Sequence, residues 1–132
     1  MTVALVTGRV LTDDGLRSGL AVLLEDARIS AVVPDDDPCL RGADAHDLRG
    51  HALLPGFIDA QVNGGGGVLF NNAPTVEAIR RIGAAHRRYG TTGFLPTLIS
   101  DEREVMRAAI AAVREAIAQD VPGVLGVHLE GP

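Results

Sequence analysis

Aromatic residues and clustered positive charge are scarce in this chain of 132 residues. It contains no Trp and one Tyr, and aromatic residues make up only 3% of the sequence. Any core must therefore be built from aliphatic side chains, and no aromatic platform is present on which nucleic-acid bases could stack. The formal net charge is −5 and the arginines are scattered. Together these features argue against nucleic-acid binding.

Cysteine and long apolar runs are scarce as well. The single cysteine, Cys39, cannot form an internal disulfide, which is typical of a reducing compartment, and we assign it no role. No stretch approaches the roughly 20 apolar residues of a membrane-spanning helix. The N-terminus lacks a basic segment followed by a long apolar one. We therefore expect a cytoplasmic protein that does not interact with membranes.

Hydrophobic residues (46%) and glycines (16) are, in contrast, abundant, which predicts a folded chain with many tight turns. Residues 1–33 contain short runs rich in Val, Leu and Ile, which predict a small β-sheet. Residues 34–50 read as a polar loop that connects two parts of the chain, and we give His46 within it no role. We expect residues 1–52 to form a β-rich segment of a small domain that includes this connecting loop.

From Leu53 onward the pattern changes to alternating strands and helices. Strands are predicted in LLPGFIDAQVNG, in TTGFLPTLI and in VLGVHLEGP. Helices are predicted between them, the second with Ser100 as its cap. This order predicts a parallel sheet with right-handed crossovers, so residues 53–132 should contain three strands and two helices.

Polar side chains mark the carboxyl end of each predicted strand, which is where parallel sheets place ligands and catalytic groups. Because strand side chains alternate between two faces, polar residues two positions apart should share a face. The polar residues at the strand ends are Asp59, Gln61 and Asn63 on the first strand, Thr97 on the second, and His128 and Glu130 on the third.

The residue pattern alone leaves two interpretations of His128 and Glu130 open. They are either metal ligands or acid–base groups, or else a hydrogen-bonded interior histidine and a glutamate that caps a neighbouring segment. A zinc site takes about three or four protein ligands, which these two residues do not supply. The run Asn63–Gly67 lacks the Lys-Ser/Thr of a P-loop, so a flexible loop is favoured over a phosphate site. His86 is interpreted as a helix histidine without a role.

Three segments in this order, LLPGFIDAQVNGGGG, GTTGFLPTLIS and GVLGVHLEGP, resemble the N-terminal third of the N-acetylglucosamine-6-phosphate deacetylases of the amidohydrolase superfamily. The resemblance implies an α/β fold: the N-terminal part of a (β/α)₈ barrel, preceded by strands of a small β-sandwich. It also implies hydrolysis of N-acetylglucosamine 6-phosphate to glucosamine 6-phosphate and acetate. The implied partners are this phosphorylated amino sugar and, in the full-length family form, further copies of the same protein.

The resemblance further implies a divalent metal ion, with zinc expected, that polarises the amide carbonyl and lowers the pKa of a bound water. Glu130 corresponds to a metal ligand of the family. Two metal-binding histidines and the catalytic aspartate are expected beyond Pro132, so no catalytic residue is assigned within the chain. Gln61 and Asn63 replace the His-x-His of many amidohydrolases, which favours a single metal. Gln61, Asn63 and His128 are expected near the site.

A barrel of this kind takes about 250 residues, so we expect a truncated piece that has no deacetylase activity by itself and whose exposed apolar edges cause aggregation. Two alternatives stay open. One is another amidohydrolase, such as a dihydroorotase-like or deaminase-like enzyme, against which Gln61 and Asn63 argue. The other is a non-catalytic remnant or interaction module, in which Glu130 and the glycines are only structural.

Overall fold

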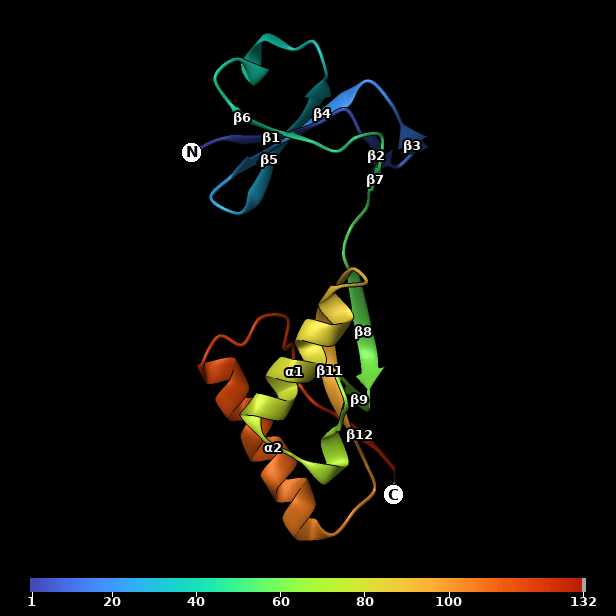
Figure 1. Cartoon of the computed structure of the whole chain (residues 1–132), viewed down its shortest axis with the longest axis vertical. Helices are drawn as coiled ribbons and strands as arrows, with labels where there is room; N and C mark the ends of the chain where they lie inside the picture. The colour runs from blue at the N-terminus through green and yellow to red at the C-terminus, as the bar shows by residue number, and fades with distance from the viewer. Residues whose placement is uncertain (132) are drawn as a thin grey trace. The chain divides into compact units, whose positions relative to one another are not determined.

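The computed structural model describes residues 1–131, which divide into two compact units, Met1–Pro55 (unit 1) and a second that begins at Gly56 (unit 2; Figure 1). The division lies three residues after the predicted change at Leu53. The difference has a structural reason: Ala52 and Leu53 form a short strand, β7 (Ala52–Leu53), that pairs in parallel with a strand of unit 1.

Unit 1 consists of two small sheets. The four-stranded sheet has the order β5-β4-β1-β6 and the three-stranded sheet has the order β3-β2-β7. Their strands are β1 (Val3–Val6), β2 (Arg9–Thr12), β3 (Gly15–Arg17), β4 (Leu20–Glu25), β5 (Arg28–Pro34), β6 (Asp44–Asp47) and β7, with a 3₁₀ turn, η1 (Pro38–Leu40), between β5 and β6.

The segment of residues 34–50, predicted as a polar loop, contains regular structure. Strand β6 pairs in parallel with β1, in the register Val3↔Asp44 to Val6↔Asp47. All of its side chains are exposed, so the alternation of apolar and polar residues that marks a half-buried strand is absent. The prediction of a loop was therefore wrong at β6, because backbone pairing alone forms this strand.

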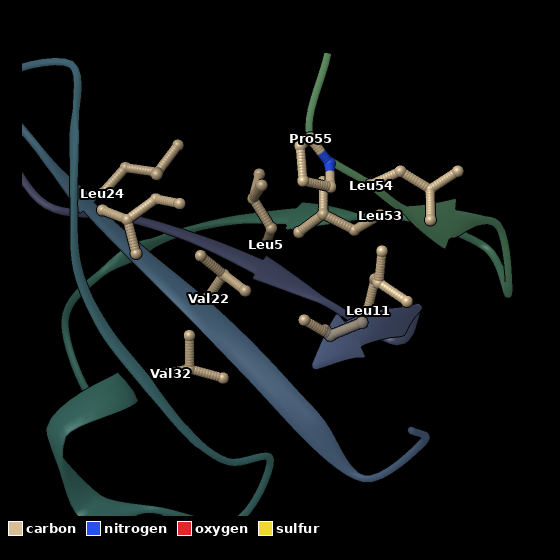
Figure 2. Close-up of a pocket in the computed structure, with 10 residues that line it drawn as sticks. Leu5, Leu11, Val22, Leu24, Val32, Leu53, Leu54 and Pro55 are labelled. Carbon is tan, nitrogen blue, oxygen red and sulfur yellow. The ribbon is translucent and has the colours of Figure 1, made fainter. Parts of the chain in front are cut away.

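The apolar side chains of unit 1 surround an open cavity of about 290 Å³ (Figure 2). Val22 on β4 is only 2% exposed and points into this space together with Leu5 on β1. No α-helix of residues 1–55 covers either sheet, so aliphatic side chains alone must fill the interior. The cavity is lined by Leu5, Val10, Leu11, Val22, Leu24, Ile29, Val32, Leu53, Leu54 and Pro55.

Unit 2 follows the predicted order of strand, helix, strand, helix, strand. Its three-stranded sheet has the order β12-β11-β8, and both pairings are parallel. A small hairpin and a 3₁₀ turn lie between β8 and the first helix. The elements are β8 (Phe57–Val62), β9 (Gly64–Gly65), β10 (Val68–Leu69), η2 (Phe70–Asn72), α1 (Val76–Arg87), β11 (Thr91–Ile99), α2 (Arg103–Ala118) and β12 (His128–Glu130).

The two helices begin differently. Helix α1 is capped by Thr75, whose side chain accepts the backbone N–H of Ala78. Helix α2 begins at Arg103, and its N-cap residue, Glu102, makes no side-chain capping bond. The prediction that Ser100 caps α2 was wrong, because its hydroxyl binds the carbonyl oxygen of Glu130 instead.

Both helices pack against β11 and bury one face of the sheet. Gly83 on α1 allows close approach, since a Cβ at this position would lie 2.8 Å from Cε1 of Phe94. Apolar side chains elsewhere on the sheet remain open, with Ile58 70% and Leu125 56% exposed. No helix within residues 1–131 has the length and apolar character needed to cross a membrane.

Candidate functional site

The carboxyl ends of β8, β11 and β12 meet at one edge of the sheet of unit 2 (Figure 1). β11 is the central strand, and it pairs Thr97 with His128 and Ile99 with Glu130. On its other side the last pair joins Pro96 to Val62. Residues in and beside these last pairs therefore lie at the same edge, although they come from three separate parts of the sequence.

Glu130 is held at this edge by two amide side chains from β8 and the residue after it. Nε2 of Gln61 donates to Oε2 of Glu130 at 3.0 Å, and Nδ2 of Asn63 donates to the same oxygen at 3.2 Å. Within residues 1–131, Oε1 of Glu130 accepts no hydrogen bond, and the residue is exposed. The structure thus brings Gln61, Asn63 and Glu130 together and leaves one carboxylate oxygen available.

Asp59 does not join this group. Its Oδ1 accepts the backbone N–H of Gln61 at 3.1 Å. The pairs Phe94↔Asp59 and Pro96↔Val62 show that β8 has one extra residue between these points, so simple alternation is interrupted there. The expectation that Asp59 shares a face with Gln61 and Asn63 assumed an unbroken strand.

Thr97 has a structural role that its position at the strand end did not reveal. It is 0% exposed, and its hydroxyl accepts the backbone N–H of Val62 at 2.9 Å and donates to the carbonyl of Leu95 at 3.1 Å. The preceding residue, Pro96, has no N–H to donate, and the strand pairing is irregular at this point. The hydroxyl therefore satisfies a backbone donor beside the irregularity.

His128 is half-buried on β12, beside Thr97. Its Nδ1 is buried and has no hydrogen-bond partner within the part of the chain that the structure describes. Buried polar atoms of this kind are rare because they lose hydration without compensation. His128 and Glu130 lie two residues apart on one strand and so share a face, but no hydrogen bond between their side chains is found among residues 1–131.

Sequence reasoning missed Asn71, a half-buried residue of η2. Its Nδ2 donates to the carbonyl of Ile99 at 3.0 Å and to Oδ2 of Asp101 at 2.9 Å, and its Oδ1 accepts the N–H of Ile99 at 3.0 Å. Hydrogen bonds from Asn71 and, secondly, from the N–H of Glu102 lower the pKa of Asp101. No local pattern marks Asn71, because its partners lie 28 and 30 residues away.

The glycine run after Asn63 packs against α1. Nε2 of His86 lies 2.9 Å from the carbonyl oxygen of Gly64, and Nη2 of Arg81 donates to the carbonyl of Gly66 at 2.9 Å. A Cβ on Gly65 would lie 2.9 Å from Nε2 of His86. The run therefore permits close packing, and its carbonyl groups, rather than its N–H groups, contact these side chains. The expectation of a flexible loop was wrong at Gly64–Gly65, which form strand β9 of the small hairpin. His86, to which no role was given, contacts β9 from helix α1.

Among residues 1–131, the strand ends of unit 2 offer a metal ion one carboxylate ligand, Glu130, and not a complete set of ligands. Residues 1–131 contain no group of three or more His, Cys, Asp or Glu side chains that could hold a metal. The available oxygen of the Glu130 carboxylate has the chemistry of a ligand for a divalent ion. Gln61 and Asn63 direct their NH₂ groups at Glu130, and an NH₂ group has no lone pair for a metal. The arrangement therefore fits a site to which this chain contributes Glu130.

No family model matches the chain, but curated relatives match it along most or all of its length. The chain is 46% identical to the N-acetylgalactosamine-6-phosphate deacetylase of Shewanella sp. (strain ANA-3), over 94% of its own length and 32% of the relative. It is 35% identical to the N-acetylglucosamine-6-phosphate deacetylase of Haemophilus influenzae, over 100% of its length and 34% of the relative.

A solved structure gives the same result. The chain superposes on the N-acetylglucosamine-6-phosphate deacetylase of Pasteurella multocida with a TM-score of 0.92 and 35% identity, covering 100% of this chain and 35% of that one. The resemblance found in the three sequence segments is thereby confirmed. The chain is homologous along its whole length to the N-acetylglucosamine- and N-acetylgalactosamine-6-phosphate deacetylases, and it spans about a third of the length of these relatives.

Proposed function

We propose that the chain is part of a metal-dependent deacetylase that hydrolyses N-acetylglucosamine 6-phosphate to glucosamine 6-phosphate and acetate. The observation that carries the proposal is the Glu130 carboxylate, held through one oxygen by Gln61 and Asn63 where three parallel strands end. The match to the Pasteurella multocida deacetylase, with a TM-score of 0.92, supports the same conclusion.

Glu130 would hold the single divalent ion, for which we propose zinc. When bound, such an ion polarises the amide carbonyl and lowers the pKa of the water that attacks it. Gln61 and Asn63 orient the carboxylate by donating to Oε2, which leaves Oε1 for the ion. His128 lies on the same strand face, and its buried Nδ1 makes it a residue near the site.

The fold supports a corresponding proposal for the architecture. We infer that residues 53–132 provide the first three strands and two helices of a (β/α)₈ barrel and that residues 1–52 belong to a small β-domain. In support, β8, β11 and β12 are parallel and are joined through helices, as in a barrel. Within residues 1–131, β8 and β12 are the two outer strands of the sheet, and each has one side on which a further barrel strand could pair.

A second substrate is favoured by one observation. The N-acetylgalactosamine-6-phosphate deacetylase of Shewanella is 46% identical to the chain, whereas the Haemophilus influenzae N-acetylglucosamine-6-phosphate deacetylase is 35% identical. The two sugars differ only in the orientation of the hydroxyl at C4. N-acetylgalactosamine 6-phosphate is therefore the alternative substrate.

The test uses a hybrid enzyme in which residues 1–132 replace the homologous third of the Pasteurella multocida deacetylase. We expect the hybrid to bind one metal ion per chain and to release acetate from N-acetylglucosamine 6-phosphate. A kcat/KM for N-acetylgalactosamine 6-phosphate that is higher than in the parent Pasteurella multocida enzyme would show that residues 1–132 favour the second sugar. Changing Glu130→Ala should lower metal affinity and kcat/KM by more than about 100-fold, because a direct ligand contributes more than the 10–100-fold of an outer residue.

Glu104→Ala serves as the control, since Glu104 is an exposed carboxylate on α2 whose ion pair with Arg107, at 3.9 Å, is fully at the surface. It should leave metal content and turnover unchanged. Full metal occupancy and turnover in Glu130→Ala would overturn the proposal. A metal-bound hybrid that releases acetate from neither sugar, beside an active parent enzyme, would show that residues 1–132 do not complete a deacetylase site and would contradict the proposal.

A further inference from the structure

The ends of the three strands are joined into a closed ring of hydrogen bonds around Glu130. Asn63 donates to the Glu130 carboxylate through Nδ2, and the backbone carbonyl of Asn63 accepts the N–H of Phe70 at 2.8 Å. The next residue, Asn71, binds both the N–H and the carbonyl of Ile99. Ser100 closes the ring, donating to the carbonyl of Glu130 through its N–H at 2.9 Å and its hydroxyl at 3.2 Å.

Within this ring, the amide of Asn71 takes the place of a neighbouring strand. In a parallel sheet the N–H and C=O of one residue point to the same side, and those of the next residue point to the other. Ser100 directs its N–H to β12, so Ile99 directs its N–H and carbonyl to the side of β8. The pairing with β8 ends at Pro96↔Val62. Asn71 therefore supplies the donor and the acceptor that β8 no longer provides.

The two hydrogen bonds between the Asn71 side chain and the backbone of Ile99 fix the peptide group that precedes Ser100. Ser100 in turn fixes the backbone carbonyl of Glu130. Two of the three groups that hold Glu130 thus depend on η2: Asn63 through the Phe70 N–H, and Ser100 through Asn71. The exposed Ile99 can exchange its bonds to Asn71 for bonds to water, so the loss of Asn71 should loosen the ring without unfolding the unit.

We propose that Asn71 is a positioning residue of the metal site: its carboxamide holds the end of β11 so that Ser100 keeps Glu130 in place for the ion. The proposal rests on the proposed function only in taking Glu130 as the metal ligand. The side chain of Asn71 binds Ile99 and Asp101 and makes no hydrogen bond to Glu130 within residues 1–131, so its effect on Glu130 passes through Ile99 and Ser100.

The test measures metal affinity in the hybrid enzyme by competition with a chelator, together with kcat, KM and thermal stability. Asn71→Ala should weaken zinc binding about tenfold, within the range for residues that orient a ligand, while KM at saturating zinc changes less than about twofold. Asn72→Ala is the matched control, because Asn72 is the next residue of η2, is exposed, and makes no side-chain hydrogen bond within residues 1–131. It should leave zinc affinity unchanged.

A pair of further variants separates positioning from stability. Asn71→Asp places a carboxylate against Asp101 and loses the donors to Ile99 and Asp101, so zinc binding should be at least as weak as in Asn71→Ala. Adding Asp101→Asn restores one donor–acceptor pair, since the new amide can donate to the carboxylate at 71 and Oδ1 can still accept the N–H of Glu102. Zinc affinity should then recover in part.

The outcomes keep the two proposals apart. If Glu130→Ala abolishes zinc binding while Asn71→Ala lowers only thermal stability, Asn71 is a structural residue and the inference is wrong. An equal loss of zinc affinity in Asn72→Ala, or no recovery in the double variant, would also contradict it. If Glu130→Ala retains zinc, the proposed function fails first, whatever Asn71 does. As a second readout, hydrogen exchange of the Ser100 amide should accelerate in Asn71→Ala and not in Asn72→Ala.

Discussion

Unit 1 and unit 2 use polar side chains in different ways. In unit 1 the hydrogen bonds between side chains are isolated, as between Thr2 and Glu25 or between Thr7 and Asp47. In unit 2 such bonds converge at one edge of the sheet, where Glu130 accepts from residues 67 and 69 positions away in the sequence. Two side chains from distant parts of the sequence thus converge on one carboxylate at the candidate site, whereas those of unit 1 bind one partner each.

The two units also differ in packing. The interior of unit 1 retains an open apolar cavity of about 290 Å³, whereas helices α1 and α2 fill the corresponding side of the sheet in unit 2. Phe94 shows the difference, since it is 2% exposed and lies against Gly83, where even one added carbon would clash. The candidate site therefore lies on the more tightly packed unit, which suits the rigid support that a binding site needs.

The largest expected effect follows from this packing. Phe94→Ala should lower the free energy of unfolding of unit 2 by about 3–5 kcal/mol, because it removes a buried aromatic ring from a filled core. Urea unfolding followed by far-UV circular dichroism at the helix band measures it, since the α-helices of residues 1–131 lie in unit 2. Phe57→Ala, at a site 61% exposed, is the control and should cost much less. Equal losses would mean that the core is looser than its contacts indicate.

A smaller effect is expected at Thr97. Thr97→Val keeps the shape of the side chain but leaves the N–H of Val62 without its acceptor, which should cost about 1–3 kcal/mol. Thr97→Ser retains the hydroxyl and should keep this bond. The same unfolding experiment compares the two variants. A valine variant as stable as the serine variant would show that the hydroxyl does not support the irregular pairing of β8 and β11.

The cavity offers a matched comparison of the two units. Val22 on β4 and Val62 on β8 are both strand valines with 2% exposure, but only Val22 lines the cavity. Val62→Leu should destabilise unit 2 by about 1–3 kcal/mol through overpacking. Val22→Leu should change stability by less than about 1 kcal/mol, because the added group can enter the cavity. Hydrogen exchange of the amides of β4 and β8 reports each unit separately, and similar losses in both would contradict the comparison.

The smallest effect concerns pH. The pKa of Asp101 is lowered from its ordinary 3.8 mainly by the hydrogen bond from Asn71. A lowered pKa in the folded state stabilises the fold above pH 3.8, and this contribution is lost as pH falls from there through the folded pKa. In Asn71→Ala the pKa of Asp101 should rise toward 3.8, as an NMR titration of its side-chain carboxyl carbon would show. An unchanged pKa would mean that the N–H of Glu102 is the main cause.

Much of unit 2 could be predicted from the sequence because its signals are local. The apolar face of α1, the β-rich run at Thr91–Ile99 and the polar residues after each strand are all visible over a few residues. Gln61 and Asn63 were expected near Glu130, and the structure brings them into contact with it. The role of Glu130 as a metal ligand stays a prediction that the hybrid enzyme tests.

The remaining features depend on contacts that local patterns do not encode. Strand β6 has no buried side chain, so only its pairing with β1 reveals it. Asn71 reads as an ordinary loop asparagine until its bonds to Ile99, 28 residues away, are seen. Ser100 precedes a helix and suggested a cap, but the Glu130 carbonyl competes for its hydroxyl. In each case an interaction between distant segments decides the outcome.

Pro96 has a further consequence for how the strands align. It lies in the central strand of the sheet, beside an irregularity in the pairing with β8, and the hydroxyl of Thr97 receives the Val62 N–H there. Sliding β8 by a single position would break that bond and turn Gln61 to the opposite face. A misaligned β8 would therefore lose both the bond to Thr97 and the hydrogen bond from Gln61 to Glu130. The residues that set the register of β8 thus also position the Glu130 carboxylate.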